Sequence, residues 1–460
     1  MASQNGAARR DPRRHPSYAQ QRRPEPQRRP SYPPQQRRSA PHNPPRSSAY
    51  PQRKRPSLSR EEALRRQEQR RYQAERTAEM KAESEALARG PIDLPFCLLV
   101  ALLAAIGLVM LLSASFPSAY YETRTRNPIF YFSRQGLFAV AGLAAMLFIS
   151  KFNYQRFRGL AKILMYISIV LLVLVLIPHN PIAITANNAT RWLGIKGTSF
   201  QFQPSEVAKM AVILYFSDSI SKKMDKMHSF RYGIAPYAVI LIVTAGLVAL
   251  EPHLSGAILI LGAGAALMLV GGINWGWVLG ALGAAGGFLY FALFVVGYNA
   301  SRIQSWLDPW ADMQDTGYQL SQSLITIGSG GLLGVGLGKS RQKFLYLPEE
   351  HNDFIFAIIC EELGLIGAAI IMLLFAALIL RGYWIALHAR DRFGSLLAVG
   401  VTTLVAMQTF LNIGVVTGLL PTTGISLPFF SYGGTALMIQ LAEMGVVLSV
   451  SRQMKPTKAG

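Results

Sequence analysis

Three aspartates near the start of one long polar segment are the first residues whose type and spacing could do chemistry. Asp308, Asp312 and Asp315 lie within residues 299–353, between two apolar runs. A carboxylate can accept a proton from a hydroxyl group. Lys343 follows in the same segment, and a cation can stabilise an anionic or phosphate group. Long ordered loops are uncommon unless they are functional, so this segment predicts a reactive site, with all three aspartates open as the base.

A second charged group lies inside an apolar run. Glu206 and Lys209 are three residues apart, which places both on one face of a helix. Placing a charge at membrane depth costs at least about 2.5–3.5 kcal/mol, so each charge should face a partner or a cavity. Two interpretations follow: a functional cavity that contains the pair, or a purely structural Glu–Lys pair between helices.

These residues must be positioned by membrane helices. The chain has 460 residues, of which 51% are hydrophobic and 15% charged, with a mean hydropathy of +0.26. The first 90 residues hold 22 of the 46 Lys and Arg and 9 of the 25 Asp and Glu, so they carry 13 of the 21 net positive charges. The high pI therefore averages a basic tail with an apolar body, and the body is expected to be an integral membrane protein.

The tail divides into two parts. Residues 1–58 are predicted to be disordered, because twelve prolines and five Arg-Arg pairs leave little apolar surface to bury. Residues 59–90 predict a charged juxtamembrane helix, which begins with a capping box at Ser59 and Glu62 and ends at Gly90. The expected partner of the basic tail is anionic membrane lipid. Nucleic acid is not expected, because no aromatic-glycine motif alternates with the arginines.

The body, residues 91–452, predicts an all-α integral membrane protein of about ten transmembrane helices. A span needs about 20 mostly apolar residues, and the candidate spans are 94–115, 131–150, 160–178, 204–220, 233–250, 254–271, 275–298, 354–380, 395–415 and 433–450. With the tail inside, the inner loops hold fourteen Lys and Arg and the outer side holds nine. The positive-inside rule then predicts a multi-pass plasma-membrane protein with both termini cytoplasmic. Residues 299–353 become a large extracellular loop, and residues 453–460 a cytoplasmic C-terminal tail.

Two other kinds of site are disfavoured. Residues 334–340 read GVGLGKS, but a phosphate-binding P-loop needs a glycine where Leu333 stands, and the segment lies on the side without ATP. Cys97 and Cys360 fall in or beside apolar runs and are expected to be buried thiols. No metal site is predicted.

Three motifs resemble one family. QPSEVAKMAVILYF, YQLSQSLITIGSGGLLGVGLGKSRQKFLYLPEEHNDFIFAIICEELGLIG and TGLLPTTGISLPFFSYGGTALM resemble the FtsW/RodA family, whose members serve shape, elongation, division and sporulation. The resemblance covers roughly residues 91–452. QKFLYLPEEH and the ending VVLSVSR are more similar to the division (FtsW) and sporulation (SpoVE) branches than to the elongation (RodA) branch.

The resemblance implies a peptidoglycan glycosyltransferase that polymerises lipid II on the outer membrane face during septal wall synthesis. It implies lipid II and the undecaprenyl-linked glycan as substrates, a class B penicillin-binding protein and other division proteins as partners, and the division septum as location. No cofactor is expected, and the sequence leaves a divalent cation open. The alternatives are a lipid II flippase, a non-catalytic division scaffold, and an elongation or sporulation paralogue.

The resemblance also selects site residues. The family's essential aspartate stands six residues before a tyrosine, which is Asp312 before Tyr318 here, although Met313 and Asp315 depart from the usual pattern. Asp315 remains the rival. Arg191 and Lys209 match cations that the family places around one cavity, with Glu206 beside Lys209 and Lys343 a weaker candidate.

Residues 421–434, PTTGISLPFFSYGG, break the helical pattern several times. Such backbone is tolerated in a membrane only where protein buries it or where it lines a wet cavity. This run therefore predicts a cavity wall, with Ser431 as a possible substrate contact. His253 stands where the family usually has Asp, and Asn352 where it usually has Thr.

Overall fold

The computed structural model describes residues 67–69, 71–73, 75, 76, 79, 90–122, 126–178, 180–186, 189–194, 201–280, 283 and 300–454. The described residues between 67 and 79 are helical. The predicted disordered tail, residues 1–58, lies outside the described residues. The same is true of 455–460, which make up most of the predicted C-terminal tail.

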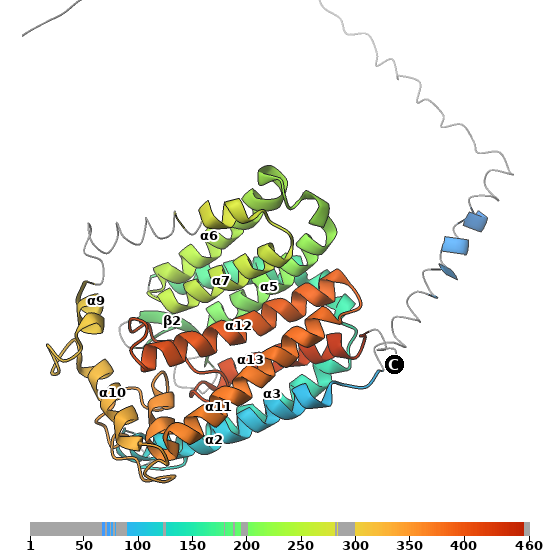
Figure 1. Ribbon diagram of the computed structural model, residues 1–460. Coiled ribbons are helices and arrows are strands. Elements are labelled where there is room, and N and C mark those ends of the chain that lie inside the picture. The colour runs from blue at the N-terminus through green and yellow to red at the C-terminus, as the bar shows by residue number, and fades with distance from the viewer. Residues whose placement is uncertain are drawn as a thin grey trace, which may run out of the picture. The chain divides into compact units, whose positions relative to one another are not determined.

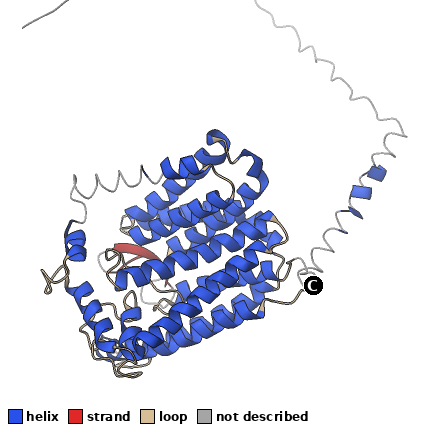
Figure 2. Cartoon of the chain, viewed as in Figure 1, coloured by secondary structure: helices blue, strands red, loops and turns tan. Residues whose placement is uncertain are grey.

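Helices make up most of the described chain (Figures 1 and 2). They are α2 (Leu94–Glu122), α3 (Phe130–Ser150), α4 (Phe157–Leu176), α5 (Pro204–Lys223), α6 (Ala235–Leu250), α7 (Leu254–Val270), α9 (Ala300–Leu307), α10 (Tyr318–Gly330), α11 (Ile355–Leu387), α12 (Arg392–Val416) and α13 (Gly434–Ser451). Single turns at Tyr154–Arg156, Met224–Lys226 and Phe230–Ile234 precede or follow these helices. The prediction of a helical membrane protein is confirmed.

Seven helices of the described residues are long and apolar enough to cross a membrane: α2, α3, α4, α6, α11, α12 and α13. Two more predicted spans, α7 and α5, do not meet these criteria of length and apolar composition. Helix α7 has only 17 residues, and α5 carries Glu206, Lys209 and Asp218 among its 20 residues. Most of the predicted span 275–298 lies outside the described residues.

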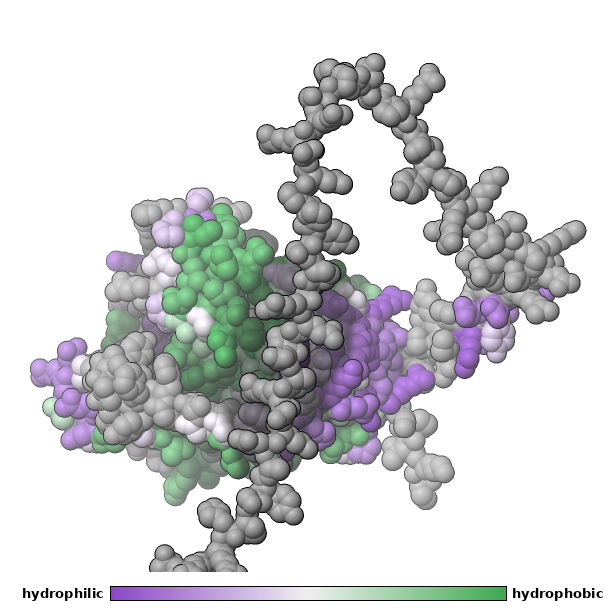
Figure 3. Space-filling view, turned by 90° about the horizontal axis from the view of Figure 1, so that it is seen from above, coloured by the Kyte–Doolittle hydropathy of each residue, from purple (hydrophilic) through white to green (hydrophobic). Residues whose placement is uncertain are grey.

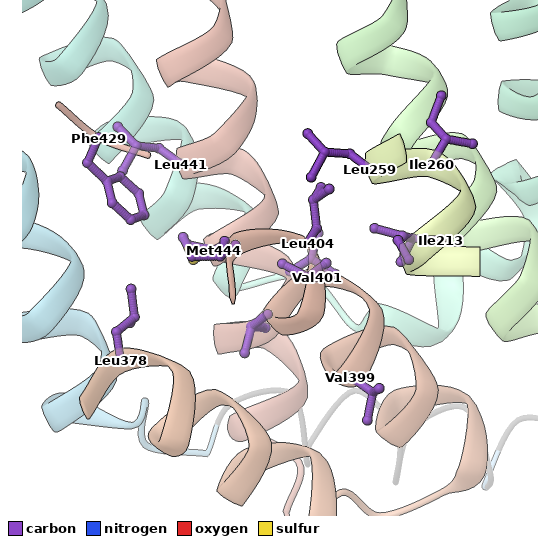
Figure 4. Close-up of a cluster of buried hydrophobic side chains, with 14 of the residues drawn as sticks. Ile213, Leu259, Ile260, Leu378, Val399, Val401, Leu404, Phe429, Leu441 and Met444 are labelled. Atoms are coloured by element: carbon purple, nitrogen blue, oxygen red, sulfur yellow. The ribbon is translucent and has the colours of Figure 1, made fainter. Parts of the chain in front are cut away.

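The centre of the bundle is formed by α5, α12 and α13. About two thirds of α12 and of α13 is buried, whereas α3, α4 and α11 bury less than a third. Ile213, Leu404 and Met444 from these three helices and Leu259 from the neighbouring α7 are buried (Figure 4). Apolar side chains also gather across the middle of one outer face, with hydrophilic ones toward its ends (Figure 3). This pattern fits lipid contact around a protein-packed centre.

A small antiparallel sheet departs from the all-α prediction. Strands β1 (Ala183–Ala186), β2 (Ala189–Gly194) and β3 (Gln201–Phe202) pair in the order β1-β2-β3, with Leu193 opposite both Ala183 and Phe202. Leu193 and Ala183 pack on Val175 at the end of α4. The strands have only two to six residues, so their pattern in the sequence is too short to predict them.

Two connections that the sequence singled out are also ordered. The predicted outer segment 299–353 contains α9 and α10, joined and followed by turns. Residues 417–433 contain no regular helix between α12 and α13. Gly424 and Phe429 have positive φ there, a conformation that is unusual for a bulky residue such as Phe429.

Candidate functional site

A cavity of about 440 Å³ lies where the sheet meets the ends of α5 and α13. Its wall includes Gly424, Ile425, Ser426, Tyr432 and Gly433 from the irregular run before α13. The prediction that this run forms a cavity wall is therefore confirmed. The charged residues that line the cavity are Arg134, Arg191, Glu206, Lys209, Glu349 and Asp353.

The first two turns of α5 place Glu206 and Lys209 in this cavity. Pro204 starts the helix, where its missing N–H removes no helical hydrogen bond. Lys209 Nζ lies 2.8 Å from Glu206 Oε2, and the lysine side chain is 2% exposed. The sequence predicted the shared face, and it left open a structural Glu–Lys pair between helices, whereas the observed pair lies within α5. Because the pair also lines the cavity, it is positioned to meet a ligand.

Strand β2 brings Arg191 to the same cavity. Its Nε donates a hydrogen bond to the Glu251 carbonyl at 3.2 Å, and its Nη2 donates to the Pro252 carbonyl. These bonds fasten the sheet to the turn between α6 and α7. The guanidinium of Arg191 therefore has a fixed location on the cavity wall.

The α6–α7 turn contributes groups without a formal charge. Both carboxylate oxygens of Glu251 are buried without a hydrogen-bond partner among the described residues. Burial raises the pKa of Glu251 to about 8, opposed by the charge of Arg191. Burial lowers the pKa of His253 to about 3, and the charges of Arg191 and Lys209 lower it further. His253, which lines the cavity, is thus neutral at pH 7.

Asp353 is a cavity carboxylate that the sequence did not single out. It lies two residues before the start of α11 and lines the cavity with Glu349. Burial raises the pKa of Asp353 to about 6, and the charge of Glu349 adds to this, whereas Arg191 and His351 oppose it. Its position could have been suspected only from its place at the end of the outer segment, next to an apolar run.

Asp312 lies outside the cavity lining, on the exposed turn between α9 and α10. Its Oδ2 accepts hydrogen bonds from the Thr316 amide at 3.2 Å and the Thr316 hydroxyl at 3.0 Å, and its Oδ1 accepts one from the Asp315 amide at 3.2 Å. These bonds, those from Thr316 first, lower the pKa of Asp312. The carboxylate is therefore ionised and held in one orientation. Asp308 makes a similar local bond, from the Trp310 amide, and Asp315 is exposed beside them.

Two predicted substrate contacts have structural partners instead. Lys343 is buried, with its Nζ 2.9 Å from Glu362 Oε1 and 3.1 Å from Ser113 Oγ. Ser431 Oγ donates to the Asn352 carbonyl at 2.7 Å and accepts from the Leu427 amide at 2.7 Å. Neither residue lines the cavity. In this structure Lys343 fastens the outer segment to α11 and α2, and Ser431 joins the irregular run to residue 352, so the substrate contacts at Lys343 and Ser431 stay predictions.

A second, apolar groove of about 330 Å³ lies on α3, α4, α5 and α13. Its wall contains Leu160, Ile163 and Ile167, which are also exposed on the outside of α4. Helix α5 contributes to both hollows, with Met210 and Leu214 in the groove and Lys209 in the charged cavity. One helix thus connects an apolar, lipid-side surface with a charged site.

Comparisons with known proteins agree with this architecture. Residues 94–456 match the family described as cell cycle protein, FtsW/RodA/SpoVE. The chain is 43% identical to the probable peptidoglycan glycosyltransferase FtsW of Geobacter metallireducens, over 79% of this chain and 96% of the relative. It is also 43% identical to the stage V sporulation protein E of Bacillus subtilis, over 78% of this chain and 97% of the relative.

Solved structures show the same fold. A chain in the structure described as structural coordination of polymerization and crosslinking by a peptidoglycan synthase complex is 28% identical, with a TM-score of 0.66, covering 79% of this chain and 98% of that chain. The rod shape determining protein RodA of Thermus thermophilus is 28% identical, with a TM-score of 0.58, covering 80% and 99%. The chain belongs to the FtsW/RodA/SpoVE family.

Proposed function

We infer that this protein is a peptidoglycan glycosyltransferase that polymerises lipid II on the outer face of the membrane. The observation that supports this most is the cavity, in which Arg191 and Lys209 lie together with carboxylates, next to an apolar groove on the lipid side. Relatives that match over nearly their full length are named probable peptidoglycan glycosyltransferase FtsW. In the proposed reaction, the 4-hydroxyl of an incoming sugar attacks the anomeric carbon of the growing strand, and undecaprenyl diphosphate leaves.

The cations are proposed to bind the diphosphate. Negative charge develops on the leaving group, and fixed cations in a partly dry cavity stabilise it without reorganising. Arg191 can bind a phosphate through two N–H groups, and Lys209 acts as a point charge. Glu206 holds Lys209 in place through the 2.8 Å contact.

Asp312 is proposed as the base that removes the hydroxyl proton. The family pattern before Tyr318 and the hydrogen bonds from Thr316, which keep the carboxylate ionised, support this role. Because Asp312 is not part of the cavity lining, the reaction requires the α9–α10 turn to approach the cavity when substrate is bound. Asp353 already lines the cavity, so it would contact the bound substrate there.

The apolar groove is proposed to hold a lipid tail of the substrate. It lies on α3, α4, α5 and α13, and its edge on α4 is exposed to the bilayer. An isoprenoid chain could enter from the membrane without crossing water. The diphosphate joined to that chain would then lie at Lys209, which is about one turn of α5 from the groove.

A class B penicillin-binding protein is the proposed partner, and septal wall synthesis during cell division the proposed role. The similarity to a chain of a peptidoglycan synthase complex supports an assembly with a crosslinking enzyme. The FtsW-named relatives favour division, whereas the sporulation relative keeps that paralogue as the alternative. We propose that both termini are cytoplasmic, as the charge distribution predicts.

A polymerisation assay in detergent tests the proposal. The purified protein and its penicillin-binding partner, with the crosslinking site blocked, receive lipid II, and the products are separated by gel electrophoresis. Detergent has no compartments, so a lipid II flippase would leave the substrate unchanged. Glycan strands support the polymerase, and their absence with a partner that binds would reject it.

A further inference from the structure

The connection after α10 interrupts a membrane helix in an unusual way. Helix α11 is kinked at Gly364, which has φ 69° and ψ −172°. In a regular helix, the Leu365 and Ile366 amides would donate to the Glu361 and Glu362 carbonyls. Here they donate to the Gly331 and Leu332 carbonyls, at 2.9 and 3.2 Å.

The Glu361 and Glu362 carbonyls, which these amides would bind in a regular helix, accept hydrogen bonds from the same connection instead. The Val335 amide donates to Glu361 O at 2.9 Å, and the Gly336 amide to Glu362 O at 3.0 Å. Both helical hydrogen bonds lost at the kink are thus replaced by residues 331–336. Freed backbone groups at membrane depth must be satisfied by protein, so this connection is part of the span and not a loose outer loop.

The approach of the two backbones depends on Gly334 and Gly364. A Cβ on Gly334 would lie 2.2 Å from Glu362 O, and a Cβ on Gly364 would lie 2.3 Å from the Gly334 amide nitrogen. No side chain fits between them. The connection is therefore held against α11 at a fixed height.

The depth of this connection in the membrane follows from the length of α11. Arg381 pairs with Asp93 at 2.7 Å and lies over the Trp384 ring, as expected of a group at the edge of the membrane. A hydrocarbon core of about 30 Å corresponds to about 20 helical residues, which places the other edge near Glu361. Residues 365 and 366, and the connection bonded to them, lie inside that edge.

At this height the connection presents leucines outward. Leu332 is 66% exposed and Leu333 80%, beside Leu365 at 59% and Ile366 at 51%. The exposed apolar stripe of α11 continues through Ile370 and Leu373. Lys339 and Arg341 follow, both exposed, where cations can reach lipid headgroups.

We propose that residues 331–338, here named the leucine anchor, insert into the outer leaflet and contact lipid acyl chains. The anchor fixes the C-terminal end of α10, whereas the N-terminal end of α10 follows the turn that carries Asp312. The outer segment is then attached to the bilayer itself as well as to the helices. This proposal does not depend on which reaction the cavity performs.

Fluorescence quenching tests the proposal on the full chain in nanodiscs of phosphatidylcholine and phosphatidylglycerol. In a background with Cys97→Ala and Cys360→Ala, an environment-sensitive label is attached at Leu333→Cys. Leu373→Cys on the lipid-facing stripe of α11 is the membrane control, and Gln314→Cys on an exposed turn is the aqueous control. Leu332→Cys replaces Leu333→Cys if that variant does not fold.

The label at Leu333→Cys should be quenched by lipids with a doxyl group on the acyl chain, well above the level at Gln314→Cys, and should resist iodide as Leu373→Cys does. Iodide quenching equal to that of Gln314→Cys, without doxyl quenching, would overturn the proposal. Iodide quenching that disappears only when the penicillin-binding partner is added would assign the leucines to a protein interface and would also overturn it.

Discussion

Lys209 and Lys343 are both buried lysines paired with a glutamate, and they differ in what surrounds the pair. Lys209 lines the charged cavity, whereas Lys343 fastens the outer segment to Glu362 and Ser113. We expect Lys209→Met to abolish polymerisation while the melting temperature stays near that of the wild type, since the Glu206 side chain is 17% exposed and lines the cavity.

Lys343→Met is the matched control. It leaves Glu362 buried without its cation, which typically costs about 3–5 kcal/mol. Its melting temperature should fall, while activity per folded molecule is retained. The cavity role of Lys209 is rejected if Lys209→Met is instead destabilised but active per folded molecule.

Asp353 makes stability depend on pH. Burial raises its pKa from 3.8 to about 6, so the folded protein holds a proton that the unfolded chain has released. The stabilisation is fully present below pH 3.8 and is lost as pH rises through about 6. Asp353→Asn cannot ionise, so the variant should gain stability relative to the wild type as pH rises, by at most about 3 kcal/mol. Melting temperatures of both proteins from acid to neutral pH check this, and a constant difference would show that folding does not shift the pKa of Asp353.

At the scale of single residues, the sequence could predict those features of the site that depend only on the spacing of neighbouring residues. Glu206 and Lys209 share a helical face because they are three residues apart, and their pairing was predictable. The position of Asp353 was not, because it depends on the end of the outer segment and the sheet, which are far apart in the sequence, lining one cavity. The roles of Lys343 and Ser431 likewise depend on distant partners, Glu362 and Asn352.

At the scale of elements, the kink of α11 is the feature most sensitive to substitution. Gly364 has a backbone conformation nearly restricted to glycine, and its Cβ position is occupied by the Gly334 amide. Gly364→Ala should destabilise the protein by at least about 2 kcal/mol. Gly328→Ala in α10 is the control, because nothing lies near its Cβ position, and it should be neutral or stabilising. Equal melting temperatures for the two variants would contradict this account of the kink.

Hydropathy predicted most helices because a lipid-facing span is apolar over its whole length. Helix α5 is less apolar because it carries charges, lies in the centre of the bundle and faces the cavity. The kink of α11 could not be predicted, since the apolar pattern continues through Gly364. The strands of the sheet are too short to show a period.

At the scale of the whole molecule, positive charge is concentrated before the membrane domain. Residues 1–56 supply most of the excess but no apolar core, so removing them should leave polymerisation of lipid II in detergent unchanged. Binding to vesicles with anionic lipid should weaken, by roughly 1 kcal/mol for each cation near the surface. Gel analysis of glycan and vesicle co-sedimentation measure the two effects. Loss of polymer in the truncated protein would contradict the separation of tail and enzyme.

The central claim is that an outer-face aspartate takes a proton during glycan polymerisation. Asp312→Asn is nearly isosteric on an exposed turn, so folding and partner binding should be retained. General-base catalysis typically contributes about 10²–10⁴-fold, so polymerisation of lipid II by the purified complex should fall by that factor. Asp308→Asn and Asp315→Asn, on the same turn, should keep substantial activity. Wild-type polymerisation by Asp312→Asn, or loss of activity in Asp315→Asn alone, would contradict the account.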